Sequence, residues 1–343
     1  MRITNLRAVQ PPTPDSPKDW RTSLGQILVA VDTDSGLTGY GVGGGGGASI
    51  HVVQTVLRDL LLDEDPTDVE ALWRRMYRAT MPYGRKGLAI MAISGVDLAL
   101  WDLRGKTRGL PVAELLGGGV GKPIPAYITL TGSAEEALAV GYRAMKVHFR
   151  LSAEAFLQGD EVIEHVEKTR AAIGPDCELM CDAFMSWDVE TTLRYAEALR
   201  AFDLQWIEEP LPPDDWDGYA ELCRRSPIPI AGGEHEYTAQ AFAELIDRGA
   251  HHVLQPDVCW CGGMTELVKI YEMANLAGLR VCPHRGSEPW SLHAIAALDP
   301  RPLAESGRPW MTWVGGQPKI VDGQVQLDDA PGFGVEIAPR LLP

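Results

Sequence analysis

The 343-residue sequence has no cluster of basic residues, no long apolar run and few cysteines. The formal net charge is −16, so the chain is not expected to bind nucleic-acid phosphates. No run approaches the roughly 20 apolar residues that cross a bilayer, and residues 1–17 do not resemble a signal peptide, so no membrane partner is expected. Six thinly spread cysteines favour free thiols in a cytoplasmic protein over a disulfide framework.

Up to about residue 122, the pattern predicts an antiparallel hairpin followed by helices. Residues 26–41, QILVAVDTDSGLTGYG, form two predicted strands around a DSG turn, and the apolar spacing of residues 88–105 predicts a buried helix. The glycine-rich stretch 42–51 follows a hairpin rather than a parallel βαβ unit, which disfavours a phosphate-binding loop. We expect a flexible surface loop there, or a lid that closes over a substrate.

From Pro125 onward, short apolar runs alternate with amphipathic helical stretches. Strands that alternate with helices predict parallel βαβ units, and so many in under 200 residues favour a closed barrel. Catalytic residues of such barrels lie at the carboxyl ends of the strands. The eight runs are PAYITL, RAMKVHF, CELMCDAF, LQWIEE, PIPIAGGE, HHVLQPD, LRVCPH and RPLAES.

Carboxylates end three successive strands of this predicted barrel. Asp182, Glu208 and Glu234 follow one another at intervals of 26 residues, about one βα unit. Three acids on one rim would repel one another unless a cation compensates them, and Glu209 beside Glu208 adds to the problem. Oxygen ligands suit a hard divalent cation, in particular Mg²⁺. The alternative is three unrelated acids at solvated strand ends.

The next two strands end in Asp257 and His284. On neighbouring strands, the carboxylate would fix the imidazole tautomer and make the other ring nitrogen a general base. Lys146 and His148 lie two residues apart, hence on one face of their strand. Lys146 is expected to meet the substrate carboxylate or to pair with a ligand carboxylate. For His148, a substrate contact and a packed structural role both stay open.

These residues in this order resemble the mandelate racemase subgroup of the enolase superfamily. The resemblance spans nearly the whole chain, through VDLALWDLRGK, WIEEPLPP, GGEHE and QPDVCWCGG. It implies an α/β fold, namely a (β/α)7β modified TIM barrel over residues 123–317. It also implies an α+β capping domain over residues 1–122, completed by the tail 318–343. Implied roles are Mg²⁺ on the three carboxylates, a catalytic His284–Asp257 pair, and Glu305 holding an enediolate oxygen.

Within the subgroup, stretches such as ATMPYGRKGLAIMAISGVDLALWDL, DAFMSWDV and PGFGVE are similar to the L-rhamnonate dehydratases. The resemblance implies a lyase that converts an acid sugar to a 2-keto-3-deoxy acid, with L-rhamnonate or a close relative as its small-molecule substrate. Arg21 sits where capping-domain residues of such enzymes reach substrate hydroxyls. A homo-oligomer is also implied.

Other functions remain as alternatives. Dehydration of lyxonate, mannonate or an aldarate is the nearest, and a racemase or epimerase with His284 and His148 as opposed bases is more distant. Many relatives carry lysine where this chain has His148, which favours the one-histidine dehydratase. A Schiff-base aldolase using Lys146 leaves the three carboxylates unexplained. A barrel that serves only as a scaffold would be expected to have lost members of the site.

Overall fold

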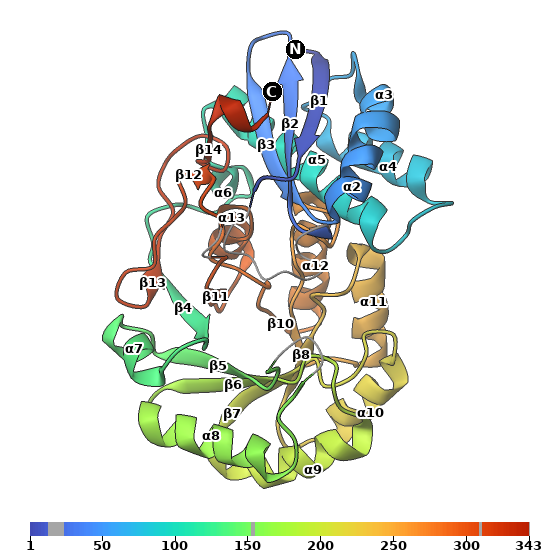
Figure 1. The fold of residues 1–343 in the computed structure, drawn as a ribbon. Coiled ribbons are helices and arrows are strands. Elements are labelled where there is room, and N and C mark those ends of the chain that lie inside the picture. Colours follow the sequence, from blue (N-terminus) through green and yellow to red (C-terminus); the bar gives the residue numbers. More distant parts are fainter. Residues whose placement is uncertain (13–23, 152–154, 309–310, 343) are drawn as a thin grey trace.

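The computed structural model describes residues 1–12, 24–151, 155–308 and 311–342. A small sheet with helices lies above a ring of parallel strands and helices, and both chain ends lie in the upper region (Figure 1). The small sheet has the antiparallel order β1 (Ile3–Val9), β2 (Ile27–Thr33), β3 (Thr38–Gly43). Its helices are α2 (Gly46–Val52), the π-helical turn η1 (Val53–Leu57), α3 (Arg58–Leu61), α4 (Val69–Thr80), α5 (Leu88–Arg108) and α6 (Val112–Leu115).

The predicted hairpin and the predicted buried helix are both confirmed. β2 and β3 pair around a turn in which Gly36 has a φ of +82°, a left-handed conformation that glycine adopts without strain. α5 is almost entirely buried, and it ends at Gly109, which has a φ of +67°. A left-handed glycine after the last turn is a common helix stop, because it lets the final carbonyl groups be satisfied.

Strand β3 lies against α5 without side chains between them. A Cβ atom on Gly39, Gly41 or Gly43 would lie only 2.1–2.3 Å from the carbonyl oxygens of Ala99, Gly95 and Met91, respectively. Alternate residues of a strand face one side, and every fourth residue of a helix lies on one face, so the two repeats match. Glycine at these three positions therefore sets how closely the sheet approaches the helix.

The prediction of a flexible loop or lid over residues 42–51 is wrong. Val42 and Gly43 belong to β3, helix α2 begins at Gly46, and residues 41–46 are buried. A Cβ on Gly44 would lie 2.8 Å from Nε1 of Trp260, which belongs to a barrel loop. The glycines permit close packing here, a use that composition alone does not distinguish from flexibility.

The lower region is an eight-stranded parallel barrel, as the alternating pattern predicted. Its strands follow the order β10-β9-β8-β7-β6-β5-β4-β11; seven of the eight predicted runs contain one of them, and the first run, PAYITL, begins one residue after the start of its strand. The strands are β4 (Ile124–Thr129), β5 (Ala144–His148), β6 (Glu178–Asp182), β7 (Leu204–Glu208), β8 (Ile230–Gly232), β9 (Val253–Leu254), β10 (Arg280–Val281) and β11 (Ala304–Glu305).

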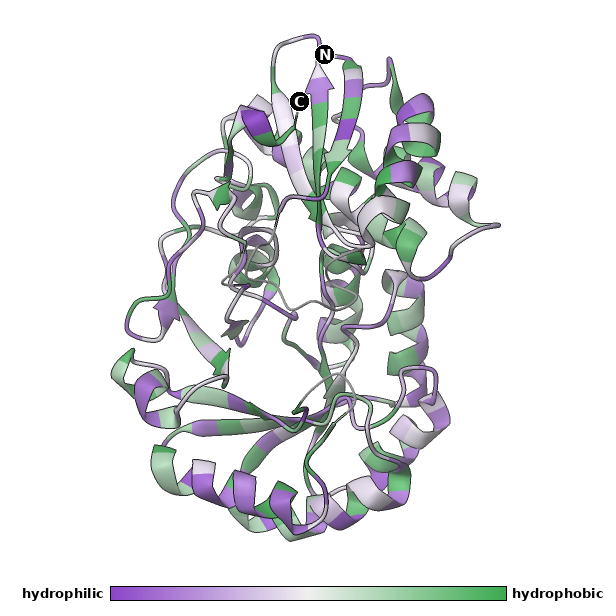
Figure 2. Ribbon diagram, in the orientation of Figure 1, coloured by the Kyte–Doolittle hydropathy of each residue, from purple (hydrophilic) through white to green (hydrophobic). Residues whose placement is uncertain are grey.

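Helices cover the outside of the barrel. In Figure 2 the outer helices carry both hydrophobic and hydrophilic bands, as expected when one face packs on the strands and the other meets water. The helices are α7 (Ala134–Ala139), α8 (Asp160–Ile173), α9 (Val189–Leu199), the 3₁₀ turn η2 (Arg200–Phe202), α10 (Trp216–Arg225), α11 (Thr238–Arg248), α12 (Met264–Leu276) and α13 (Pro289–Leu298). Within the described residues, no helix is both long and apolar enough to span a membrane.

A ring of buried side chains fills the barrel interior. One residue comes from each strand or from the position next to it: Tyr127, Ala144, Met180, Trp206, Ala231, Val253, Cys282 and Leu303. The ring is complete although β10 and β11 share no ladder hydrogen bonds within the described residues. At this seam, Cys282 Sγ lies 3.6 Å from the carbonyl oxygen of Leu303. Side-chain packing thus closes the barrel where backbone pairing does not.

The upper region is fixed to the barrel loop that follows β9 and to the first turn of α12. Asp97 of α5 accepts hydrogen bonds from Thr265 Oγ1 (2.6 Å) and Thr265 N (3.0 Å). Trp73 of α4 donates to Gly262 O at 2.7 Å, and Ser94 accepts from Gly262 N at 2.9 Å. The loop that begins at Asp257 is therefore held from above by buried hydrogen bonds.

The tail of the chain contacts both regions. β12 (Val314–Gly315) pairs with β14 (Glu336–Ile337), while β13 (Gln324–Val325) pairs with barrel strand β4. Phe333 N donates to Asp102 of α5 at 3.0 Å. The 3₁₀ turn η3 (Pro339–Leu341) follows β14. The tail therefore links the small sheet and its helices to the first barrel strand.

Candidate active site

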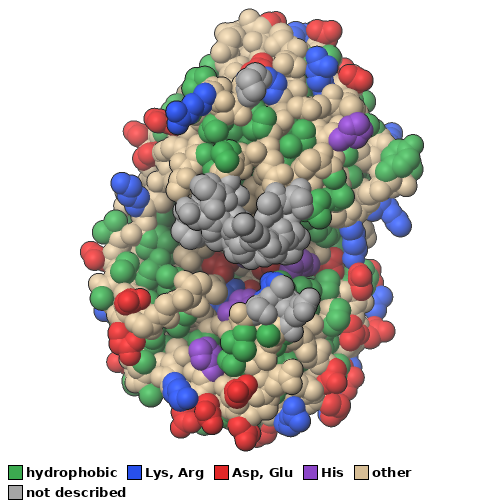
Figure 3. Space-filling model, in the orientation of Figure 1, with side chains coloured by type: hydrophobic (Ala, Val, Ile, Leu, Met, Phe, Trp, Pro, Cys, Tyr) green, Lys and Arg blue, Asp and Glu red, His purple; other side chains and the backbone are tan. Residues whose placement is uncertain are grey.

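A cavity of about 600 Å³ opens at the carboxyl ends of the barrel strands. Figure 3 shows histidine and acidic side chains in the hollow between the upper and lower regions. Most residues singled out from the sequence meet here, although they are up to 159 positions apart in the chain, as between Lys146 and Glu305. The lining includes Lys146, His148, Asp182, Glu234, His284 and Glu305.

Two of the three expected ligand carboxylates lie on neighbouring strands in register. Asp182 at the end of β6 is opposite Glu208 at the end of β7, and both are buried. Glu234 follows β8 by two residues, and its charge acts on both of the others. The regular spacing along the chain therefore does bring the three acids to one rim.

Lys146 lies among these carboxylates. Its Nζ is 2.5 Å from Glu208, 3.0 Å from Glu305 and 3.7 Å from Asp182, and its side chain is only 3% exposed. Of the two alternatives drawn from the sequence, pairing with carboxylates is the one seen. Because Lys146 also lines the cavity, the contact with a substrate carboxylate stays a prediction.

One lysine does not compensate these three acids, of which Asp182 and Glu208 are buried. Burial raises the pKa of Asp182 to about 7 although Lys146 opposes the shift, and the pKa of Glu208 rises to about 7 for the same reason. Burial also raises the pKa of Glu234, against the charge of His284. Acids that resist ionisation in this way fit a site that a cation completes, and an all-oxygen donor set suits a hard divalent ion.

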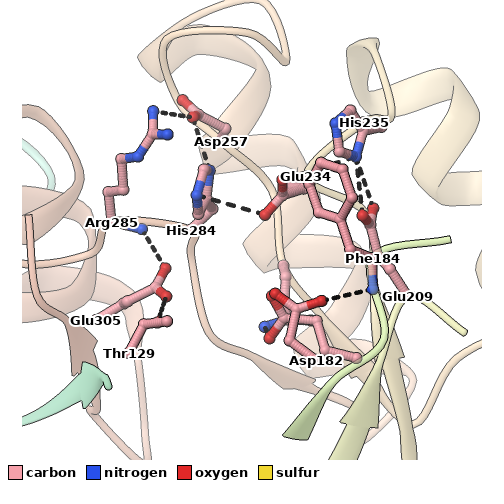
Figure 4. Close-up of polar contacts among 12 residues, drawn as sticks. Thr129, Asp182, Phe184, Glu209, Glu234, His235, Asp257, His284, Arg285 and Glu305 are labelled. Carbon is pink, nitrogen blue, oxygen red and sulfur yellow. Dashed lines mark hydrogen bonds and ion pairs between the residues drawn. The ribbon is translucent and has the colours of Figure 1, made fainter. Parts of the chain in front are cut away.

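Glu209 and His235 belong to the site but were not predicted. Nδ1 of His235 is 2.9 Å from both carboxylate oxygens of Glu209 and 3.7 Å from Glu234 (Figure 4). Burial lowers the pKa of His235, but Glu209 outweighs it and raises the pKa to about 9, so His235 is the cation that neutralises Glu209. The Glu208–Glu209 doublet and the sequence GGEHE were the available signals.

Glu209, Glu234 and His235 also form a possible metal-ion group. One ligand atom from each lies within 4.8 Å of the others. Glu234 therefore takes part in both candidate ligand sets. In the structure, Nδ1 of His235 is engaged with Glu209, whereas the cost of ionisation falls on Asp182 and Glu208. Among the described residues, Glu209, Glu234 and His235 are the group whose ligand atoms lie this close together, and the set of Asp182, Glu208 and Glu234 stays a prediction.

The expected histidine–aspartate pair is formed. Nδ1 of His284 lies 2.9 Å from Asp257, whose other oxygen accepts a hydrogen bond from Cys259 N at 2.7 Å. Nε2 of His284 faces the cavity and lies 3.4 Å from Glu234 (Figure 4). Burial raises the pKa of Asp257, but the hydrogen bond and charge of His284 outweigh it and lower the pKa to about 2. An ionised Asp257 holds the imidazole in one tautomer.

Glu305 at the end of β11 accepts three contacts. Thr129 Oγ1 donates at 2.9 Å, Arg285 N donates at 2.8 Å, and Lys146 Nζ lies at 3.0 Å. Burial raises the pKa of Glu305, but Lys146 outweighs it and lowers the pKa to about 2. Glu305 is thus an ionised acceptor that orients Lys146.

His148 is oriented by the backbone of its own strand end. Its Nδ1 accepts a hydrogen bond from Arg150 N at 2.9 Å, which leaves the ring proton on Nε2, 3.5 Å from Asp182. Burial and the charge of Lys146 lower the pKa of His148 to about 4. His148 is therefore a neutral hydrogen-bond donor. Arg21, the expected substrate contact, lies outside the described residues.

Family profiles match most of the chain. The profile described as "Mandelate racemase / muconate lactonizing enzyme, N-terminal domain" matches residues 9–117, and "Enolase C-terminal domain-like" matches residues 130–341. A parallel barrel under a cap, with acids on its rim, is the architecture of enolase-type enzymes. The chain belongs to the mandelate racemase/muconate lactonizing enzyme family of the enolase superfamily.

The chain is also similar to individual members of the family. The chain is 40% identical over 331 residues to the L-rhamnonate dehydratase of Saccharopolyspora erythraea, covering 93% of this chain and 84% of the relative. A rhamnonate dehydratase of Gibberella zeae in complex with Mg is 31% identical, with a TM-score of 0.85 over 99% of this chain and 95% of the other. The 3,6-anhydro-D-galactonate cycloisomerase of Zobellia galactanivorans is 30% identical, with a TM-score of 0.87 over 99% and 98% of the chains.

Proposed function

We propose that this protein is a Mg²⁺-dependent acid-sugar dehydratase that acts on an aldonate, with L-rhamnonate or a close relative as its substrate. The reaction removes the proton at C2 and the hydroxyl group at C3, and it yields a 2-keto-3-deoxy acid and water. The curated relative at 40% identity and the Mg complex of a rhamnonate dehydratase support both the reaction and the ion. Members of the family also catalyse other reactions, so the residues of the site must determine which reaction this protein catalyses.

The single observation that carries the proposal is that the described residues of the cavity include one oriented base. Nδ1 of His284 is held by Asp257, and Nε2 faces the cavity and Glu234. His148 has the opposite arrangement, because its Nδ1 is occupied by Arg150 N and its Nε2 carries the proton. A racemase needs a base on each face of C2, whereas an elimination needs only one base that later acts as an acid.

Asp182, Glu208 and Glu234 are the residues that we propose to hold Mg²⁺. When bound, the ion supplies positive charge beside the substrate carboxylate, which stabilises the charge that develops as the C2 proton leaves. The raised pKa values of Asp182 and Glu208 support this assignment, since a cation would relieve the cost of ionising both.

His284 takes the C2 proton at Nε2 and then returns a proton to the departing 3-hydroxyl, which leaves as water. Asp257 stabilises the imidazolium between the two steps. Lys146 adds a second positive charge, and Glu305 orients it through the contact at 3.0 Å. His148 would donate its Nε2 proton to a substrate oxygen. Contact of Arg21 with substrate hydroxyls stays a prediction.

The experiment that tests the proposal is a screen of sugar acids with the purified protein and Mg²⁺. Each aldonate and aldarate is incubated with the enzyme, and 2-keto-3-deoxy products are detected with semicarbazide. We expect product from L-rhamnonate or a close stereoisomer, and none after chelation of the metal. Product from lyxonate, mannonate or a diacid alone would keep the reaction class and change the substrate.

A second arm separates the dehydratase from a racemase or epimerase. In deuterated water, an epimerase would return substrate labelled at C2 with inverted configuration, whereas a dehydratase accumulates ketoacid. Labelled, inverted substrate without ketoacid would overturn the proposal.

All six cysteines are free thiols, which supports the cytoplasm as the compartment of this protein. A homo-oligomer stays a prediction.

A further inference from the structure

A second ring of inward-facing positions lies above the apolar ring of the barrel interior. Alternate residues of a strand share a face, so these positions come two residues after the members of the first ring. The second ring consists of Thr129, Lys146, Asp182, Glu208, Gly233, Gln255, His284 and Glu305. Its charged members and His284 all take part in the proposed reaction, and Thr129 donates to Glu305. Gln255 is the side chain of this ring that is left without a role.

Gln255 directly follows β9 and is only 1% exposed. Its backbone N donates to Gly232 O at 2.9 Å, which continues the parallel pairing of β8 with β9. Its side-chain Nε2 donates to Oε2 of Glu208 at 2.6 Å. Because β8 lies between β7 and β9, the side chain spans the end of β8, where Gly232 and Gly233 carry no side chains. Both ends of the Gln255 side chain are therefore fixed.

The contact determines which way the amide group of Gln255 points. An ionised carboxylate accepts hydrogen bonds and donates none, so the amide turns its NH₂ group toward Glu208. Oε1 of Gln255 is buried and has no hydrogen-bond partner within the described residues. A buried acceptor without a donor destabilises a fold, whereas an apolar side chain of similar size would have no such acceptor. Packing alone therefore does not explain a glutamine at this position.

The two carboxylate oxygens of Glu208 have different surroundings. Oε2 accepts from Gln255 Nε2 and from Trp206 Nε1, the latter at 3.3 Å. Oε1 lies 2.5 Å from Nζ of Lys146. Two neutral donors thus occupy one oxygen, and the charged contact is made by the other. Hydrogen-bonding groups of this kind orient metal ligands, and losing one typically weakens metal binding by about 10- to 100-fold.

We propose that Gln255 is a positioning residue for the metal site, because it holds Oε2 of Glu208 and so leaves Oε1 open to a divalent cation. This inference rests on the proposed function, in which Glu208 is one of the Mg²⁺ ligands. Gln255 is not among the described residues that line the cavity, so it acts through Glu208 and not on the substrate. The competing explanation is that Gln255 serves only the stability of the fold, as the partner of a buried acid.

The test measures Mg²⁺ binding and stability on the same variants of the full chain. Gln255→Met keeps the approximate length of the side chain and removes the donor. Gln54→Met is the control, because it also removes a glutamine donor, whose Nε2 bonds to Ala8 O at 3.0 Å in the upper region. Calorimetry on chelator-treated protein gives the Kd of Mg²⁺, and urea unfolding in chelator gives the stability without metal.

We expect Gln255→Met to raise the Kd of Mg²⁺ by about 10- to 100-fold, and Gln54→Met to change it by less than about twofold. When activity is titrated with Mg²⁺, the concentration that gives the half-maximal rate of Gln255→Met should rise by a similar factor. An unchanged Kd together with a lower stability without metal would assign Gln255 to the fold alone and overturn the inference.

A second variant covers poor folding of Gln255→Met. Gln255→Asn keeps the amide, but its side chain is one methylene shorter and cannot keep the contact with Glu208 from the same backbone position. The same rise in Kd is expected. Binding of Mg²⁺ by Gln255→Asn with the affinity of the wild type would overturn the inference.

Asp182→Asn separates this inference from the proposed function, because it removes a proposed ligand rather than a positioning residue. If Asp182→Asn weakens Mg²⁺ binding and Gln255→Met does not, the inference alone is rejected. If the wild type binds no Mg²⁺, or if neither variant weakens binding, the ligand set of the proposed function is rejected and this inference with it.

Discussion

On the β6–β8 side of the rim, the pKa values of Asp182 and Glu208 are raised to about 7, whereas across the cavity those of Asp257 and Glu305 are lowered to about 2. All four side chains are buried, and burial alone would raise every one of these values. The difference in pKa therefore comes from the cations and hydrogen-bond donors around each acid. Asp257 pairs with His284, and Glu305 accepts two hydrogen bonds in addition to its contact with Lys146. Asp182 and Glu208 share that same lysine.

The two sides also differ in how the backbone holds them. Strands β6, β7 and β8 are joined by parallel ladders, so Asp182 and Glu208 are placed by register. On the β10–β11 side, Arg285 N bonds to Glu305 and Ser287 N bonds to the Glu305 carbonyl group, and no ladder is present within the described residues. Asp257 and Glu305 are ionised and orient other groups, whereas burial makes Asp182 and Glu208 resist ionisation.

The largest expected effect is the loss of the base. His284→Asn should lower kcat by on the order of 10⁴-fold, because no other described group in the cavity is an oriented base. Mg²⁺ affinity, measured by calorimetry, should stay within about threefold of the wild type, since the three proposed ligands are unchanged. Retained dehydration in this variant would show that His284 is not the base. The two sides of the rim would then no longer differ in that only one of them supplies the base.

The next effect concerns stability without metal. Asp182→Asn removes a buried charge that is poorly compensated, so the metal-free variant should be more stable than the wild type by on the order of 3 kcal/mol at pH 8. Urea unfolding after chelation measures this difference.

Added Mg²⁺ sharpens the same comparison. The wild type should gain about 2.7 kcal/mol at a concentration 100 times the Kd, because the ion binds only the folded state, and Asp182→Asn should gain little. If the variant is less stable than the wild type without metal, the carboxylate is better compensated than its raised pKa indicates, and the contrast with Asp257 weakens.

The smallest effect is the acid dependence of stability on the opposite side. The folded-state pKa of Asp257 is about 2, below its ordinary value of 3.8, so its contribution to stability is present above about pH 4 and is lost as the pH falls toward 2. Between pH 5 and pH 2, the wild type should therefore lose about 2 kcal/mol more than Asp257→Asn, which does not titrate. Equal losses in urea unfolding would mean that His284 does not hold Asp257 in the ionised form.

The sequence predicted the barrel and the rim well because both repeat. A period of one βα unit brings Asp182, Glu208 and Glu234 to equivalent strand ends, and the same period extends to Asp257 and His284. His235 was missed because the residue after a ligand has no spacing of its own, although its contact with Glu209 explains the acidic doublet.

In the glycine-rich stretch, by contrast, the sequence predicted a property that the structure does not have. Composition predicted mobility, but the glycines at 43–46 are buried against α5, Trp260 and Ser49. Glycine is required both where a chain must bend freely and where another backbone lies too close for a Cβ atom, and the two cases have the same composition. Only the partner surface, here the carbonyl oxygens of α5, distinguishes them.

The glycines of β3 also have a consequence for how this enzyme can evolve. Gly39, Gly41 and Gly43 meet three successive turns of α5, and α5 in turn holds the loop that begins at Asp257 through the hydrogen bond from Gly262 N to Ser94. Any larger residue at these positions would push the sheet away from the helix, because its Cβ atom would lie only 2.1–2.3 Å from a carbonyl oxygen of α5. Selection for a new sugar acid can therefore exchange residues in the rim loops one at a time, but it inherits the distance between β3 and α5 unchanged.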